Sequence, residues 1–201
     1  MGFDLYGLKP YNPNNAVRPE HLDWSKKPAD NEKDEYFKKV DEYETEVIGS
    51  YFRNNVWWWR PLWSFVIAAC DDILTERDKE AGSYNDGHII SKTKSLRIAA
   101  RLTKLDKDGT IDKYSNEMNP MIERAKKNNK KIQIKVILLQ KMVKLETGVE
   151  NMVPKDYPKK FYDKYMKLMD KEDWSAHYPF DIDNIRSFTL FCKQSGGFEI
   201  C

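Results

Sequence analysis

The residue types best suited to chemistry gather in one stretch, residues 51–74, which has the sequence YFRNNVWWWRPLWSFVIAACDDIL. Four of the six tryptophans lie there, with two arginines and two asparagines beside them. An indole ring stacks on a nucleobase at roughly 1–3 kcal/mol per base, a guanidinium binds phosphate, and an asparagine amide reads a base edge. The stretch therefore predicts either a nucleotide-type binding site or an aromatic core on which the arginines stack. Its candidate binding residues are Arg53, Asn54, Asn55, Trp57, Trp59 and Arg60.

A second candidate lies in the polar connection that follows, residues 75–90. Asn85, Asp86 and His88 put an amide, a carboxylate and an imidazole within four residues, and Tyr84 precedes them. The imidazole is suited to acid–base work or to contact with a phosphate. Asn, Asp and Gly are also the residues of an ordinary turn, so a turn without function stays an alternative. We take Tyr84, Asn85, Asp86 and His88 as further candidate ligand-binding residues.

No metal or cofactor site is predicted. The three cysteines form no CxxC pair and the three histidines lie far apart, which excludes a zinc site made by neighbouring residues. Residues 106–112 resemble the middle of a calcium-binding loop, but Lys104 and Ser115 occupy the positions of its first and last ligands. Walker, dinucleotide, nucleophile-elbow and HExxH motifs are absent. This lack of a recognisable catalytic set favours a binding protein over an enzyme, without deciding between them.

Length and composition set the frame. A chain of 201 residues is expected to form one domain, residues 1–201, and its net charge of +2 gives no general attraction for nucleic acid. Scattered cysteines favour a reduced, cytosolic setting. The most apolar run, residues 132–143, is too short to span a bilayer, so no contact with a membrane is expected.

The elements that must position these residues are mainly helices. Apolar residues recur at helical spacing in residues 32–47, 91–108, 111–127, 132–145 and 157–169, and Asp183 is expected to cap a last helix. Pro61 suits the first turn of another helix. That helix should be buried, because its apolar residues leave no broad polar face.

Residues 3–8, 51–57 and 198–201 are typical of short strands. On an extended segment Trp57 and Trp59 would share one face, and Trp58 would take the other. Because short isolated strands are unstable, the three should pair in one small sheet with the Pro61 helix packed against it. The predicted class is α+β, mainly helical, with a small sheet formed by the chain ends and the central Trp-rich segment. This arrangement would bring Arg53, Arg60, residues 85–88 and the turn at residues 195–197 towards one edge.

Three sequence blocks stand out: MGFDLYGL at the start, YFRNNVWWWRPLW in the middle and FCKQSGGFEIC at the end. A fourth segment, SYNDGHIISKTK at residues 83–94, belongs with them. As a set they resemble a family of small uncharacterised proteins of tailed bacteriophages, over about a third of the chain. Other members carry a cysteine-rich insertion similar to a zinc ribbon where this chain has residues 127–174. Those cysteines are missing here, so the resemblance implies no zinc. It implies viral origin and a place in the cytoplasm of a bacterial host.

These features together favour a phage protein that acts as a sponge for a small nucleotide signal of host immunity, such as a cyclic nucleotide or an ADP-ribose derivative. Reversible capture needs no nucleophile. An alternative is a protein-binding inhibitor or accessory factor of a host enzyme, because exposed Trp, Tyr and Arg also form interface hot spots. A third reading is a nucleotide-cleaving enzyme that uses His88 and Asp86. A homo-oligomer is compatible with all three.

Overall fold

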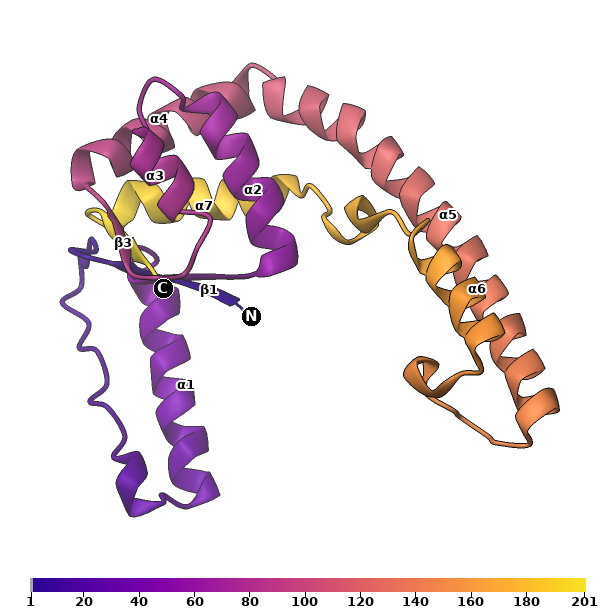
Figure 1. The fold of residues 1–201 in the computed structure, drawn as a ribbon. Helices are drawn as coiled ribbons and strands as arrows, with labels where there is room; N and C mark the ends of the chain where they lie inside the picture. Colours follow the sequence, from indigo (N-terminus) through magenta and orange to yellow (C-terminus); the bar gives the residue numbers. More distant parts are fainter. Residues whose placement is uncertain (1) are drawn as a thin grey trace. The chain divides into compact units, whose positions relative to one another are not determined.

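A computed structural model describes residues 2–201 (Figure 1). Helices dominate, and one four-stranded antiparallel sheet contains both chain ends, so the predicted α+β class is confirmed. The chain divides into two compact units, residues 1–113 with 180–201 and residues 114–179. That the whole chain folds as one domain stays a prediction.

The first unit is built on a sheet with strand order β2-β1-β4-β3. Its strands are β1 (Gly2–Gly7), β2 (Tyr51–Asn55), β3 (His88–Ile90) and β4 (Phe198–Ile200). β1 pairs with β2 on one side and with β4 on the other, as the sequence predicts. β3 was not predicted, because its three residues lie at the end of the stretch interpreted as a polar connection, residues 75–90.

One face of the sheet is covered by helices and carries the core. Phe3, Leu5, Phe198 and Ile200 alternate with more exposed residues along their strands and are at most 2% exposed. α2 (Val56–Ala69) and α7 (Ile182–Gln194) pack on this face, and α4 (Lys92–Lys107) packs against α7 and α2 (Figure 1).

The central stretch changes from strand to helix earlier than expected. α2 begins at Val56, because the Asn55 side chain accepts hydrogen bonds from the backbone N–H groups of Trp57 and Trp58 at 3.0 and 3.1 Å. The predictions that the strand runs to residue 57, and that Pro61 opens the helix, were therefore wrong. Pro61 lies inside α2. The tryptophans are thus distributed around a helix and not on alternate faces of a strand.

Two further local predictions are corrected. Residues 75–90 contain a short helix, α3 (Glu76–Ala81), which begins with a capping box formed by Thr75 and Asp78. The cap of α7 is Asp181 and not Asp183, since the Asp181 carboxylate accepts from the Asn184 N–H at 2.7 Å.

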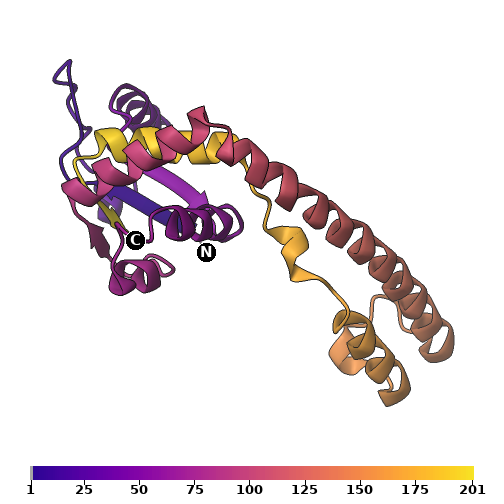
Figure 2. The ribbon, with the colours of Figure 1, turned by 90° about the horizontal axis from the view of Figure 1, so that it is seen from above.

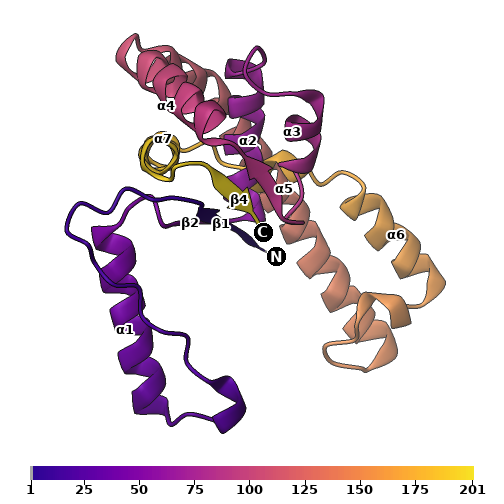
Figure 3. The same ribbon diagram turned by 90° about the vertical axis from the view of Figure 1, so that its left-hand side faces the viewer.

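α1 (Asp30–Glu46) stands apart from this core. It projects from the sheet together with the loop that precedes it, a loop that contains the short 3-10 helix η1 (Trp24–Lys26), as Figures 1 and 3 show. None of the α1 side chains is buried. The helix expected at residues 32–47 is confirmed.

The second unit contains most of α5 (Thr110–Thr147), a single helix of 38 residues that continues through Pro120. The sequence had suggested two helices here. α6 (Lys159–Met169), preceded by η2 (Pro154–Asp156), lies along α5 (Figure 2). The second unit has its own buried cluster, made of Leu139, Val143, Tyr157 and Phe161. The short 3-10 helix η3 (Trp174–His177) follows α6 in the chain. No helix within residues 2–201 is both long and apolar enough to cross a membrane.

Candidate functional site

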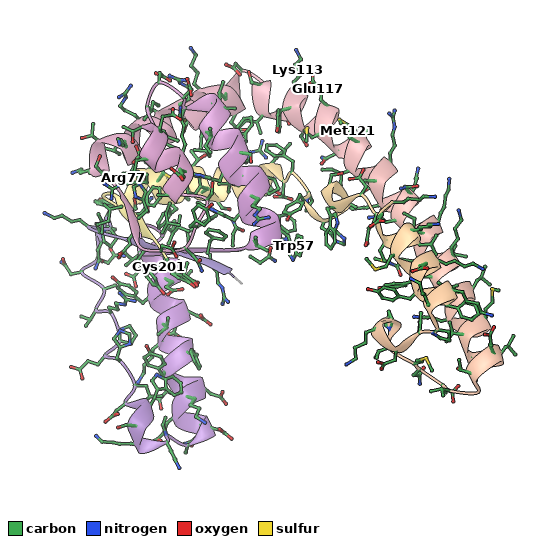
Figure 4. All side chains as sticks on the ribbon, in the orientation of Figure 1. Trp57, Arg77, Lys113, Glu117, Met121 and Cys201 are labelled. Carbon is green, nitrogen blue, oxygen red and sulfur yellow. The ribbon has the colours of Figure 1, made fainter. Side chains whose placement is uncertain are left out.

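A pocket of about 330 Å³ opens between α3 and the loop that leads into β3. Its lining residues are Arg77, Glu80, Ala81, Tyr84, Asp86, Gly87 and His88. Three of them, Tyr84, Asp86 and His88, were predicted from the sequence. Arg77, which Figure 4 labels on α3, and Glu80 were missed, because residues 76–81 were interpreted as loop. The charges of the segment ERDKEA after Thr75 were the signal for a capped helix.

His88 is held in the pocket by a buried carboxylate. Its Nε2 lies 3.0 Å from Oδ1 of Asp78, whose side chain is only 5% exposed. Oδ2 of Asp78 accepts the Thr75 N–H at 2.8 Å and the Thr75 hydroxyl at 2.7 Å, and it is ion-paired with the Lys94 ammonium group. Asp78 therefore joins three segments of the chain behind the pocket: the start of α3, β3 and α4.

The same contacts determine the protonation state of Asp78. Burial raises the pKa of Asp78, but the hydrogen bonds from Lys94, Thr75 and His88 outweigh this and hold the pKa well below its usual range. Asp78 is thus an ionised acceptor at neutral pH. Nε2 of His88 must then be the donor, and Nδ1 is the ring atom that remains for a ligand.

Two tryptophans of α2 hold α3 in place through hydrogen bonds to backbone carbonyls. The indole N–H of Trp59 donates to the Gly82 carbonyl at 2.9 Å, and that of Trp63 donates to the Lys79 carbonyl at 3.1 Å. A Cβ atom on Gly82 would lie 2.2 Å from the Trp63 ring, so this close approach requires glycine. The two indole rings stack with centroids 5.3 Å apart. The tryptophans therefore position the wall of the pocket and do not line it.

Trp59 is accordingly a correction to the predicted site. Its side chain is 0% exposed and stacks on Phe3, with ring centroids 5.3 Å apart. Such a ring has no free face for a ligand. The partner, Phe3, comes from the other end of the chain, so no local pattern in the sequence showed that this tryptophan belongs to the core.

Both candidate asparagines of the central stretch also have structural partners. Asn54 is buried, and its amide donates to Oδ1 of Asn184 at 3.1 Å. Asn55 uses its side-chain oxygen to cap α2. Neither is among the lining residues of the pocket.

Arg53, Trp57 and Arg60 remain exposed but outside the pocket lining. Arg53 lies on the uncovered face of the sheet, with Nε 3.5 Å from the Asp4 carboxylate. Trp57 is 37% exposed in the first turn of α2, where Figure 4 labels it.

The predicted gathering at one edge is only partly correct. Asn85 donates to the Gly2 carbonyl at 3.2 Å, so its loop lies at the end of the sheet where Arg53 is found. The turn at residues 195–197 lies at the opposite end, where Gly196 closely approaches Lys9 and Gly197 approaches Lys92. The antiparallel pairing of β1 with β4 requires this separation. The turn therefore cannot serve the same pocket.

The pocket combines an aromatic ring, a guanidinium, an imidazole and two carboxylates. These side chains have the chemistry to contact a polar ligand with a flat ring and a small negative charge. Over the described chain, residues 2–201, no group of three or more His, Cys, Asp or Glu side chains is arranged to hold a metal ion.

No family model matches the chain, and no match was found among the curated proteins or the solved structures. The chemistry of the pocket therefore carries the functional argument.

Proposed function

We propose that this protein binds a small nucleotide-type ligand in the pocket between α3 and the 84–88 loop. The observation that carries the proposal is the presence of Tyr84, Arg77, His88 and Asp86 around one hollow. Tyr84 is 57% exposed and offers its ring to a base. The Arg77 guanidinium meets a phosphate, and Nδ1 of His88 and the Asp86 carboxylate accept hydrogen bonds from ribose hydroxyls or a base amino group.

The size and charge of the pocket limit the ligand class. A volume of about 330 Å³ is at the small end of ligand pockets and suits one nucleotide unit. Glu80 and Asp86 repel additional phosphates, which disfavours a triphosphate. A cyclic nucleotide fits both limits. An ADP-ribose derivative also carries less charge per base than a triphosphate, but its second ribose would lie outside the hollow.

Holding the ligand intact is favoured over cleaving it. None of the residues that line the pocket is a Ser, Thr or Cys nucleophile. Asp78, the carboxylate beside His88, is already committed to Thr75 and Lys94. Its function in this proposal is to fix the ring of His88 so that Nδ1 binds.

The biological role rests on the resemblance to phage proteins. A protein that captures a small nucleotide without turnover, in the cytoplasm of a bacterial host, would lower the free concentration of an immune signal. We therefore propose sequestration of such a signal as the function of this binding site.

Calorimetric titration with a panel of signalling nucleotides tests the proposal. One member of the panel should bind with measurable heat and raise the melting temperature. Replacing Tyr84 by Ala should weaken that binding about 5- to 150-fold, the equivalent of one lost base stack. Tyr162→Ala, which removes an exposed tyrosine on α6, is the matched control and should bind like the native protein. Absence of heat and of a melting shift across the panel would refute the proposal.

A second candidate function, inhibition of a host protein, has its own supporting observation. Trp57 and Trp58 are adjacent in the first turn of α2, and each is more than a third exposed. Exposed tryptophans are frequent hot spots of protein interfaces. Binding of a host enzyme that is lost in a Trp57→Ala/Trp58→Ala variant, while nucleotide titrations stay silent, would favour this function.

A further inference from the structure

A groove runs along the exposed side of α4, away from the candidate pocket. It has a volume of about 670 Å³, and its floor consists of Leu96, Ala99, Ala100 and Thr103. These residues follow each other at helical spacing, and three of them are small, so another helix can approach closely. Leu96 is 42% exposed although it is a large apolar residue.

The rim of the groove is positively charged. Lys104, Lys107 and Lys193 line it, and a second hollow of about 590 Å³ continues from Leu96 to Lys9 and Lys92. The one carboxylate among the lining residues of the two hollows is Asp108, which accepts hydrogen bonds from the N–H and the hydroxyl of Thr110. The groove therefore suits an acidic occupant with an apolar centre.

The chain itself contains an acidic helix with an exposed apolar residue at its centre, α1. α1 contains eight carboxylates and three lysines, a net charge of −5. Asp34, Phe37, Asp41 and Glu44 are spaced so that they share one face of the helix. Phe37 is 50% exposed at the centre of this face, with Trp24, which is 52% exposed, beside it at a ring distance of 6.1 Å.

We propose that α1 of one copy docks in the groove beside α4 of a second copy. Phe37 then covers Leu96 and the neighbouring alanines, and the carboxylates on either side of it meet the lysines of the rim. The lengths agree: Asp30 to Glu44 spans about 21 Å and Lys92 to Lys107 about 22 Å at 1.5 Å per residue. The proposal does not depend on the nucleotide pocket.

Geometry within the first unit makes this contact intermolecular. α1 and α4 belong to the same unit, and α1 projects from the side of the sheet away from α4 (Figures 1 and 3). α1, called the arm below, and the groove are different surfaces, so the contact is head-to-tail. When two copies are joined by one such contact, one copy still has a free groove and the other a free arm. Copies therefore add to one another until a ring closes. An interface formed by one helix and charged rims should be weak and sensitive to salt.

Sedimentation velocity tests the proposal with the full chain. The native protein should form species larger than a monomer as its concentration rises at low salt, and high salt should dissociate them. A groove variant, Lys104→Glu/Lys107→Glu/Lys193→Glu, and an arm variant, Asp34→Lys/Phe37→Ala/Asp41→Lys, should each be monomeric. A control, Lys126→Glu/Lys127→Glu/Lys130→Glu on α5, makes the same change of charge elsewhere and should still assemble.

Mixing the two variants gives the decisive result. The groove variant supplies an intact arm and the arm variant an intact groove, so the mixture should form a 1:1 pair and nothing larger. The single substitutions Lys104→Glu and Asp41→Lys, tested in the same way, cover the case in which a triple variant fails to fold. A native protein that stays monomeric at every concentration and salt overturns the proposal. This holds even if the groove of that monomer binds another acidic occupant, such as a single-stranded oligonucleotide. Equal assembly by native, groove and arm proteins overturns it too.

Discussion

At the scale of single residues, the pocket depends on the ionised carboxylate of Asp78. Its pKa in the folded protein lies below the value of about 3.9 expected for an unfolded chain. The unfolded state then binds more protons near pH 4, so the contribution of Asp78 to stability is present above that pH and is lost as the pH falls further. Asp78 is thus both a positioning residue for His88 and a source of acid sensitivity.

Replacing Asp78 by Asn should therefore lower the free energy of unfolding by about 1.5–3 kcal/mol at pH 7, as expected for lost hydrogen bonds to a charged group. The loss should shrink as the pH falls below about 4, because the unfolded chain then binds a proton at this carboxyl that the folded protein does not. Urea unfolding over this pH range measures both effects. Asp170→Asn, on an exposed aspartate, is the control. An Asp78→Asn protein as stable as the native one at pH 7 would contradict the account.

At the scale of elements, β4 is the strand whose loss should matter most. It lies between β1 and β3, and Phe198 and Ile200 are both 0% exposed. Removing residues 198–201 should abolish the cooperative unfolding of the first unit and ligand binding with it. Glu199→Gln, on the uncovered face of the same strand, should change little. Circular dichroism melting and titration check both, and a truncated protein that keeps its melting temperature and its ligand would contradict the topology.

The sequence was sufficient for three of the four strands of the sheet but not for β3 or for the central stretch. Alternation and the instability of lone strands predicted the pairing of both chain ends with the strand expected at residues 51–57. The high aromatic content of residues 57–59 then favoured a longer strand, although Asn55 was a cap signal for a helix. Whether Trp59 is core or ligand contact depends on Phe3, and only tertiary structure brings that ring to it. Arg77 was missed because a helix of six residues carries too short a pattern.

At the scale of the whole molecule, the two compact units should be separable in function. The candidate pocket lies in the first unit, whereas Phe161 belongs to the buried cluster of the second. Phe161→Ala should destabilise the second unit by about 3–5 kcal/mol through the cavity that it leaves. Hydrogen exchange should show faster exchange in residues 114–179, while the affinity for the nucleotide stays unchanged. Loss of binding in this variant would mean that the pocket depends on the second unit.

The small net charge of +2 conceals an uneven distribution over the molecule. α1 has a net charge of −5, whereas residues 124–145 contain eight basic and no acidic residues. Composition alone gave no sign of this separation. It is the reason why contacts between copies, and with charged partners, are expected to respond to salt.

Recovery of a bound nucleotide tests directly whether the pocket between α3 and the 84–88 loop binds such a ligand. The protein is incubated with a mixture of signalling nucleotides, freed of unbound material, denatured by heat and analysed by mass spectrometry. We expect one intact nucleotide at close to one per chain, released on denaturation and absent from an Arg77→Ala/Tyr84→Ala variant that remains folded. A native protein that retains no nucleotide, or that releases only cleaved products, would contradict it.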